Sequence, residues 1–487
     1  MRFDIATLQF ALRPQVADQA VDPRACWTAF TNLPCGVFVL LQERTVREIR
    51  TLRVMRRGLE TGSSYRLPRP SSTLPGPARI RFRQRRTGSK TWRAPEQESG
   101  DTGHRGLTAP YAMTARRKRL TVLKDRFAAA AMGARNRHEI TRVDAFPLRE
   151  PISRRAYTLV RIRTKSGLAG HGECSMVSRA DLEHARQVLI GRAATSYAGS
   201  VVGSPIHPAA IAAMLDIIGQ ACAAPLFRVL GGPTRNKVRV MTSLDGSAGA
   251  ELEASLSSGL KAGFRAFQVP APAPGARNQG QAYVRSVRAR LKALRTPARD
   301  NVDFVLDAAG RLSPGDAASL AAALEEFHLL WFDEPCPLSD LPRVRRIAET
   351  TVTPLGFGRS VNQPHSFQDL LREGILDVAR PDVLRESVVD LRRIAALAET
   401  YYVAVAPHQE GGPVATATAI HLAASLPNFF IQHIPLPSSE ADQSMRSELL
   451  SHPVETARDG FATLIPGPVL GIAVNEKALE KYKDTES

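Results

Sequence analysis

Six short apolar runs in the C-terminal half of the chain decide the fold, because each of them leads into a polar residue. They read FVLDAAG (304–310), LLWFDEP (329–335), PLGFGRS (354–360), LDVARPD (376–382), VAVAPHQ (403–409) and FFIQHIP (429–435). The pattern returns about every 26 residues, which leaves room for one strand, one helix and two loops in each interval. This repeat is typical of a (β/α)₈ barrel, where chemistry takes place at the C-terminal ends of the strands.

Working outward from these runs, the sequence predicts a complete barrel and a smaller unit before it. The eight expected strands are 237–244, 264–270, 302–307, 328–334, 354–359, 376–382, 402–408 and 429–434. Amphipathic stretches between them predict helices at 251–262, 313–326, 386–400 and 413–425. Upstream, ITRVDAFPL (140–148) and YTLVRIRTKSGLAGHGEC (157–174) predict an antiparallel meander, which helices at 180–196 and 205–224 follow.

We therefore expect an α/β protein in which a (β/α)₈ TIM barrel carries an N-terminal α+β capping domain. The expected segments are an Arg/Pro/Ser-rich extension (1–138), the capping domain (139–236), the barrel (237–440) and a tail that completes the capping domain (441–487). Eight strands with helical spacers favour a closed barrel over an open doubly wound sheet, which usually has fewer strands.

The net charge of +18 belongs almost entirely to residues 1–138, which hold 27 Lys and Arg against 10 Asp and Glu. The rest of the chain is nearly balanced, with 38 basic and 37 acidic residues. Residues 62–111 are rich in Ser, Pro, Gly and Arg, so we expect a disordered or non-native extension. A nucleic-acid-binding arm is the weaker interpretation, because no aromatic-interleaved or helix-turn-helix pattern accompanies the arginines.

The five cysteines are odd in number and lack the spacing of a metal finger, which indicates a reduced, cytoplasmic protein. The apolar run at 36–41 is too short to span a membrane, and we expect no membrane association.

Seven phrases of the sequence, in this order along the chain, resemble one known family. They are LFRVLGGPTRNKVRV (226–240), GFRAF (263–267), LDAAG (306–310), WFDEP (331–335), RPDV (380–383), VAPHQEGGP (405–413) and LPNFF (426–430). Over roughly residues 139–480 the chain resembles the mandelate racemase and muconate-lactonising group of the enolase superfamily. The resemblance implies a small-molecule carboxylate substrate, abstraction of its proton alpha to the carboxylate, an enediolate held on Mg²⁺, and a homo-oligomer.

The resemblance also assigns roles to residues at the strand ends. Asp307 falls on the first metal-ligand position and Asp333 on the second, where the family usually has Glu; Glu334 would contribute through a water. Asp382 and His408 fall on the family's Asp-His dyad, in which the carboxylate orients the imidazole for proton transfer. The C–H group beside a carboxylate is a very weak acid. Removal of its proton therefore needs a base and a cation together.

Two positions depart from the family's pattern. The third ligand position, normally Glu, is Arg359, and an arginine cannot coordinate Mg²⁺ and repels a cation. On the second strand, the family's lysine pair is replaced by Gln268 and Pro270, neither of which accepts a proton at neutral pH. We expect Arg359, His433 and Glu410 to contact the substrate carboxylate and hydroxyl groups.

The expected function is that of a metal-dependent dehydratase of a hydroxy acid or sugar acid, a lyase. Dehydration is favoured over racemisation because a two-base racemase needs a base on each face of the substrate, and the second-strand lysine is missing. A racemase or cycloisomerase of the same group is one alternative. Another is a divergent barrel without catalysis that binds a small acid, since one ligand and both lysines are replaced.

Overall fold

The computed structural model describes residues 138–484 apart from 201, 203–204, 248, 276–279, 299–300 and 362–363. The predicted Arg-rich extension therefore lies outside the described residues, except for His138. Among the residues described, no helix has the length and apolar character needed to cross a bilayer. Cys174, Cys222 and Cys336 are free thiols.

The described part of the chain begins with an antiparallel sheet. Its strands are β1 (Ile140–Arg149), β2 (Ala156–Thr164) and β3 (Ala169–Cys174), in the order β1-β2-β3. The predicted meander is confirmed. In the turn between β2 and β3, Gly167 has a φ of +83° that glycine adopts without strain. This sheet is the base of the capping unit.

The helices α5 (Arg179–Leu189) and α6 (His207–Cys222) follow the sheet, with the 3₁₀ helix η2 (Ala194–Gly199) between them. Helix α6 packs directly on β3, because a Cβ atom at Gly170 would lie 2.1 Å from the carbonyl oxygen of Ala213. The helix predicted at 180–196 was too long. It stops at Leu189 because Ile190 is extended and Gly191 takes a φ of +85°.

After α7 (Leu226–Val229), the parallel strands of the barrel follow in chain order. They are β4 (Lys237–Ser243), β5 (Ala266–Pro270), β6 (Asp303–Asp307), β7 (Phe332–Asp333), β8 (Leu355–Phe357), β9 (Val378–Ala379), β10 (Ala404–Val405) and β11 (Gln432–His433). Neighbours in sequence pair in parallel from β4 to β10, and β11 pairs with β4. A further parallel bridge between Val405 and Phe429 joins the two ends, so the sheet closes. The predicted barrel is confirmed, with shorter strands from β7 onward.

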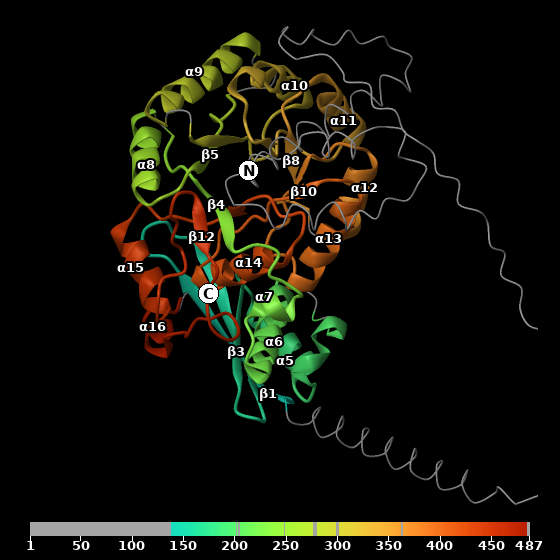
Figure 1. Cartoon of the computed structure of the whole chain (residues 1–487), viewed down its shortest axis with the longest axis vertical. Helices are drawn as coiled ribbons and strands as arrows, with labels where there is room; N and C mark the ends of the chain where they lie inside the picture. The colour runs from blue at the N-terminus through green and yellow to red at the C-terminus, as the bar shows by residue number, and fades with distance from the viewer. Residues whose placement is uncertain are drawn as a thin grey trace, which may run out of the picture. The chain divides into compact units, whose positions relative to one another are not determined.

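The helices between the strands form the outer ring of the barrel (Figure 1). They are α8 (Gly249–Lys261), α9 (Gly280–Ala298), α10 (Pro314–Ala323), the 3₁₀ helix η3 (Glu325–Phe327), α11 (Leu341–Thr350), α12 (Pro364–Arg372), α13 (Val388–Thr400) and α14 (Pro413–Ser425). Every residue of α14 is buried, because it packs against α7 and β3 of the capping unit as well as against the barrel.

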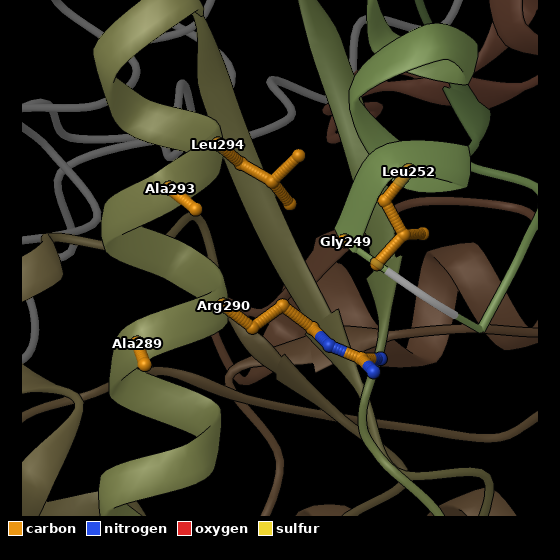
Figure 2. A pocket seen from close by; sticks show the side chains of 6 residues that line it. All are labelled: Gly249, Leu252, Ala289, Arg290, Ala293 and Leu294. Carbon is orange, nitrogen blue, oxygen red and sulfur yellow. The ribbon is translucent and has the colours of Figure 1, made fainter.

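A cavity of about 270 Å³ lies between α8 and α9, on the outside of the barrel (Figure 2). Aliphatic side chains line it, and its one charged residue, Arg290, donates to the carbonyl oxygens of Pro270 and Ser247. This cavity is a gap in the packing of two helices and lacks a reactive group.

The chain after the barrel returns to the capping unit. Helix α15 (Glu440–Leu449) is followed by β12 (Phe461–Thr463), which pairs antiparallel with β4, and by α16 (Glu476–Lys481), which lies against β1. Val469 bridges Pro225, so the segment around Val469 packs on the capping unit.

Candidate active site at the barrel mouth

Alternate side chains of a barrel strand point inward, so the interior of the barrel is filled in layers. One apolar layer consists of Met241, Ala266, Val305, Trp331, Val378, Ala406, Phe430 and Ile431. Two residues further along the strand segments come seven mostly polar inward positions, which we call the polar layer: Ser243, Gln268, Asp307, Asp333, Arg380, His408 and His433. Strand β8 contributes Gly356 instead, where a Cβ atom would lie 2.3 Å from the Trp331 ring.

Arg380 is the centre of the polar layer and has no solvent exposure. Its Nε donates to Asp333 at 3.1 Å, its Nη1 to the carbonyl oxygen of Ala406 at 2.8 Å, and its Nη2 to Gln268 at 3.1 Å. Sequence reasoning missed this residue. The signal was present, because Arg380 stands two residues before Asp382 and therefore faces the same way along the strand.

Arg359 follows β8, and its guanidinium lies between two aspartates. Its Nη2 donates to Asp307, and its Nε lies 3.3 Å from Oδ2 of Asp333. Gln268 donates to the second oxygen of Asp307 at 2.8 Å. Burial raises the pKa of Asp307, and the Arg359 charge opposes that shift. Burial disfavours the guanidinium too, but the aspartates outweigh it and raise the pKa of Arg359 above its ordinary value.

Glu334 comes directly after Asp333 but its side chain turns toward the loop that follows β8. One of its oxygens accepts hydrogen bonds from the backbone N–H groups of Gly358 and Arg359, at 2.7 and 2.8 Å. Glu334 itself has a φ of +42°. The carboxylate therefore holds the backbone of the loop that carries Arg359, and does not join Asp307 and Asp333 as a third converging ligand.

His408 is buried, with 4% exposure, and its two ring nitrogens have different partners. Nδ1 lies 3.3 Å from Nη2 of Arg380, and Nε2 lies 3.5 Å from a carboxylate oxygen of Glu410. A guanidinium can only donate, so Nδ1 accepts and the neutral ring carries its hydrogen on Nε2. Burial, reinforced by the charge of Arg359, lowers the pKa of His408 well below its ordinary value. The imidazole is therefore neutral and presents an N–H toward Glu410.

Asp382 lies beside His408, since the two residues form a parallel backbone bridge. Its carboxylate accepts from the backbone N–H of Leu384 at 2.8 Å, and Arg385 lies 4.0 Å away. Over the described residues no hydrogen bond joins this carboxylate to the imidazole, which takes its orientation from Arg380 and Glu410 instead. Burial raises the pKa of Asp382 to about 6.

His433 stacks on His408, with 5.1 Å between ring centroids. Its Nδ1 lies 2.5 Å from the carbonyl oxygen of Gln409, and its Nε2 lies 2.8 Å from the hydroxyl of Ser243. Burial and the nearby charge of Arg380 lower the pKa of His433 to about 3. Both nitrogens are thus occupied by protein atoms, and the ring supports His408 from one side.

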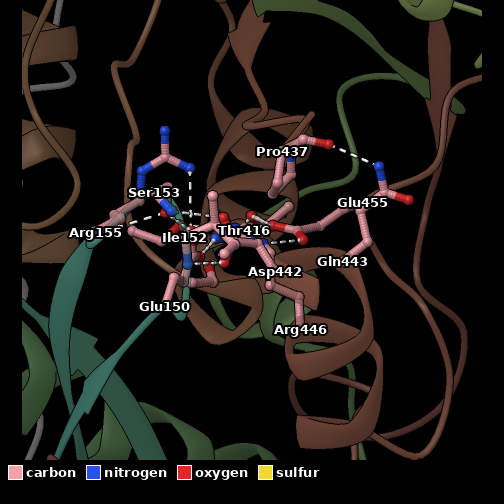
Figure 3. A network of polar contacts seen from close by, with 12 residues as sticks. Glu150, Ile152, Ser153, Arg155, Thr416, Pro437, Asp442, Gln443, Arg446 and Glu455 are labelled. Carbon is pink, nitrogen blue, oxygen red and sulfur yellow. Dashed lines mark hydrogen bonds and ion pairs between the residues drawn. The ribbon is translucent and has the colours of Figure 1, made fainter. Parts of the chain in front are cut away.

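The segment that follows His408 is fastened by the capping unit and the tail (Figure 3). Arg446 of α15 donates to Glu150, to Glu455 and to the carbonyl oxygen of Gly411. The neighbouring Asp442 accepts from the backbone N–H groups of 152 and 153, each at 2.8 Å. We call Arg446, Glu150 and Glu455 the Arg446 cluster. It ties the loop after β1 to the loop that carries Glu410.

The donor set of the mouth does not fit the Mg²⁺ that the resemblance implies. Mg²⁺ requires oxygen ligands in a near-octahedral arrangement, but the space between Asp307 and Asp333 holds the guanidinium of Arg359. The third acid, Glu334, is bound to backbone N–H groups. Among the described residues, no three His, Cys, Asp or Glu side chains converge as a metal site.

Comparison with known proteins identifies a matching family and relatives that are similar in sequence. Residues 251–478 match the enolase C-terminal domain-like family. A D-galactonate dehydratase of Variovorax paradoxus is 28% identical over 346 residues, covering 66% of this chain and 90% of that protein. A D-galactonate dehydratase family member of Streptomyces bingchenggensis is also 28% identical, over 67% of this chain and 90% of its own.

Solved structures share the fold. A mandelate racemase/muconate lactonizing enzyme-like protein from Rubrobacter xylanophilus has a TM-score of 0.64 at 23% identity, and covers 71% of this chain and 98% of its own. A putative galactarate dehydratase from Agrobacterium radiobacter, bound to sodium and L-malate, has a TM-score of 0.64 at 24% identity, over 71% and 95% of the two chains. In its capping unit, closed barrel and strand-end motifs the chain is similar to the mandelate racemase and muconate lactonizing enzymes, and residues 251–478 match the enolase C-terminal domain-like family.

Proposed function

We propose that this protein is a sugar-acid dehydratase that acts by proton abstraction alpha to a carboxylate. The observation that carries the proposal is the pairing of His408 with Glu410 at the barrel mouth, beside Asp382. The relatives named D-galactonate dehydratase support the same reaction class. Sequence reasoning assigned proton transfer to His408 and Asp382, but we now propose that Glu410 transfers the proton and that His408 positions the substrate.

The reaction breaks the C2–H and C3–O bonds of a 2,3-dihydroxy acid and releases water. The enol that remains becomes a 2-keto-3-deoxy acid. The Nδ1 of His408 accepts from Arg380, so the ring has no free lone pair to take a proton. We therefore assign the proton transfer to Glu410, which is half-exposed and within reach of a substrate. Glu410 accepts the C2 proton and returns it to the departing hydroxyl, while the Nε2–H of His408 holds the carboxylate in place.

The Mg²⁺ that the resemblance implies, with Asp307, Asp333 and Glu334 as its ligands, does not fit the donor set described above, and no step of the proposed reaction is assigned to it. We also propose the domain limits given above, a homo-oligomeric state and a cytoplasmic location for the protein.

The test is a screen of aldonic and aldaric acids, D-galactonate included, with detection of the 2-keto-3-deoxy product as its semicarbazone. We expect turnover by the wild type and a loss of at least about 100-fold in kcat for Glu410→Gln, because general acid–base catalysis contributes that much. His408→Gln tests its positioning role, and we expect kcat to fall more than KM rises. The control is Arg392→Glu on the exposed face of α13, which should turn over like the wild type. Full activity of Glu410→Gln would remove Glu410 from the reaction.

A second candidate, a barrel that binds a small acid without turnover, is favoured by Gln268. This residue stands where the family has a lysine and bonds both Asp307 and Arg380. Binding of an acid by calorimetry with no product and no exchange of its C2 proton in D₂O would select this candidate. Exchange at C2 without loss of water would select a racemase or cycloisomerase instead.

A further inference from the structure

We propose that Arg359 is the resident cation of the barrel mouth, and that this site takes up no divalent metal ion while the arginine is present. Only the contact of Arg359 with a substrate rests on the proposed function. The rest of the inference needs only the geometry, and holds whether or not the protein is an enzyme.

Three of the four oxygens of the two aspartates already accept hydrogen bonds, and the fourth faces Arg359. Asp307 accepts from Gln268, from the backbone N–H of Ala309 and from Arg359. One oxygen of Asp333 accepts from Trp331 at 2.7 Å and from Arg380 at 3.1 Å. Its other oxygen is buried without a hydrogen bond, and faces Nε of Arg359 at 3.3 Å. A metal ion bridging the two carboxylates would need the volume that the guanidinium fills.

Charge leads to the same conclusion. Arg359 and Arg380 carry two positive charges against the three negative charges of Asp307, Asp333 and Glu334, in side chains that are at most 15% exposed. A divalent ion added to this set would leave one excess positive charge in a poorly solvated layer, which is electrostatically unfavourable. Binding of a divalent cation between the two aspartates becomes favourable only when a guanidinium is removed.

The backbone holds Arg359 in this place. Gly358 has a φ of +136°, and a Cβ atom there would lie 2.6 Å from the Phe367 ring, so the position needs glycine. Glu334 accepts hydrogen bonds from the backbone N–H groups of Gly358 and Arg359 in this turn. The acid that the resemblance assigned to the metal thus fixes the loop that delivers the arginine.

The experiment is a titration of the full-length, EDTA-treated protein with Mn²⁺, followed by calorimetry and by electron paramagnetic resonance, with no substrate present. We expect no saturable site in the wild type up to about 1 mM Mn²⁺, the weak end of biological metal sites. Arg359→Glu supplies an oxygen ligand and removes the positive charge. We therefore expect one Mn²⁺ site, with a Kd at least about tenfold below that limit. Arg359→Gln, which only removes the charge, should lie between the two.

The matched control is Arg392→Glu, which makes the same change of charge on an exposed helix position and should bind no Mn²⁺. One Mn²⁺ per wild-type chain, weakened by Asp307→Asn, would overturn the inference, and so would a folded Arg359→Glu that gains no site. If that variant does not fold, the wild type and Arg359→Gln decide. Failure of the acid-sugar screen would leave this titration unaffected, so the two proposals can fail separately.

Discussion

Arg446 and Arg359 each lie between two carboxylates, one where the capping unit meets the tail and the other at the barrel mouth. The Arg446 guanidinium is 3% exposed, and its Nε, Nη1 and Nη2 all donate hydrogen bonds, to Glu150, Glu455 and a backbone carbonyl. The Arg359 guanidinium is 15% exposed, and its Nε has no hydrogen bond within the described residues. The first cluster is completely satisfied, whereas the second leaves buried polar atoms unmatched.

The difference separates a structural role from a chemical one. A satisfied buried network fixes the geometry of the elements it joins, and the Arg446 cluster joins the loop after β1 to the loop after His408. An unmatched pair such as Nε of Arg359 and Oδ2 of Asp333 is a place where a ligand can improve the contacts. The comparison predicts that mutations in the first cluster affect stability and mutations in the second affect binding.

The largest expected effect is on the Arg446 cluster. Arg446→Met removes the cation that is hydrogen-bonded to Glu150 and Glu455, and leaves Glu150 only the more distant Arg155 at 3.8 Å. We expect a loss of about 3–5 kcal/mol in the free energy of unfolding. Denaturant titration measures it. The control is Arg393→Ala, which breaks an ion pair with Asp390 whose arginine is 63% exposed, and should cost at most about 1 kcal/mol. Similar losses in both variants would mean that the Arg446 cluster contributes no more to stability than an exposed ion pair.

Arg359→Met should cost less, about 1–2 kcal/mol, between the values typical of buried and of exposed pairs. Asp307 borders the mouth, with 14% exposure, so it can take up a proton or water when the guanidinium is gone. The same denaturant titration compares the two variants directly. If Arg359→Met loses as much as Arg446→Met, the two clusters are equivalent and the contrast between them fails.

The positions of the site residues were predictable from the sequence because the strand period is two and the barrel is closed. Asp307, Asp333 and His408 follow apolar inward positions by two residues, so a strand register alone brings them into one layer. Arg359 was expected beside these acids, and the structure pairs it with both aspartates. These positions can be predicted from the strand pattern and the fold alone.

Other features depend on information that a local pattern does not hold. Arg446 and Glu150 are 296 residues apart, and neither segment carries a motif that indicates the other. The direction of the Glu334 side chain depends on its positive φ and on the turn at Gly358, which hydrophobic periodicity does not report. The tautomer of His408 depends on Arg380, whose burial is a consequence of the completed barrel.

The smallest expected effect concerns Glu173 of β3, a carboxylate with no guanidinium bonded to it among the described contacts. It accepts the backbone N–H groups of Gly412 and Ala415, and so caps α14 from the capping unit. Burial outweighs these hydrogen bonds and raises the pKa of Glu173 to about 7. Because no guanidinium is hydrogen-bonded to Glu173 and the nearby charge of Arg446 does not offset burial, the stability contribution of this acid should respond to pH.

Glu173→Gln tests this through the pH dependence of stability. Between pH 4.5 and 7 the native protein keeps a proton on Glu173 that the unfolded chain has lost, so this residue's contribution to stability falls as pH rises. The amide cannot titrate, so the unfolding free energy of the wild type minus that of the variant should fall by about 1 kcal/mol from pH 6 to pH 7. Glu183→Gln, an exposed control at 57%, should show no such trend. A difference that is constant with pH would show that the backbone N–H groups, and not burial, decide the protonation of Glu173.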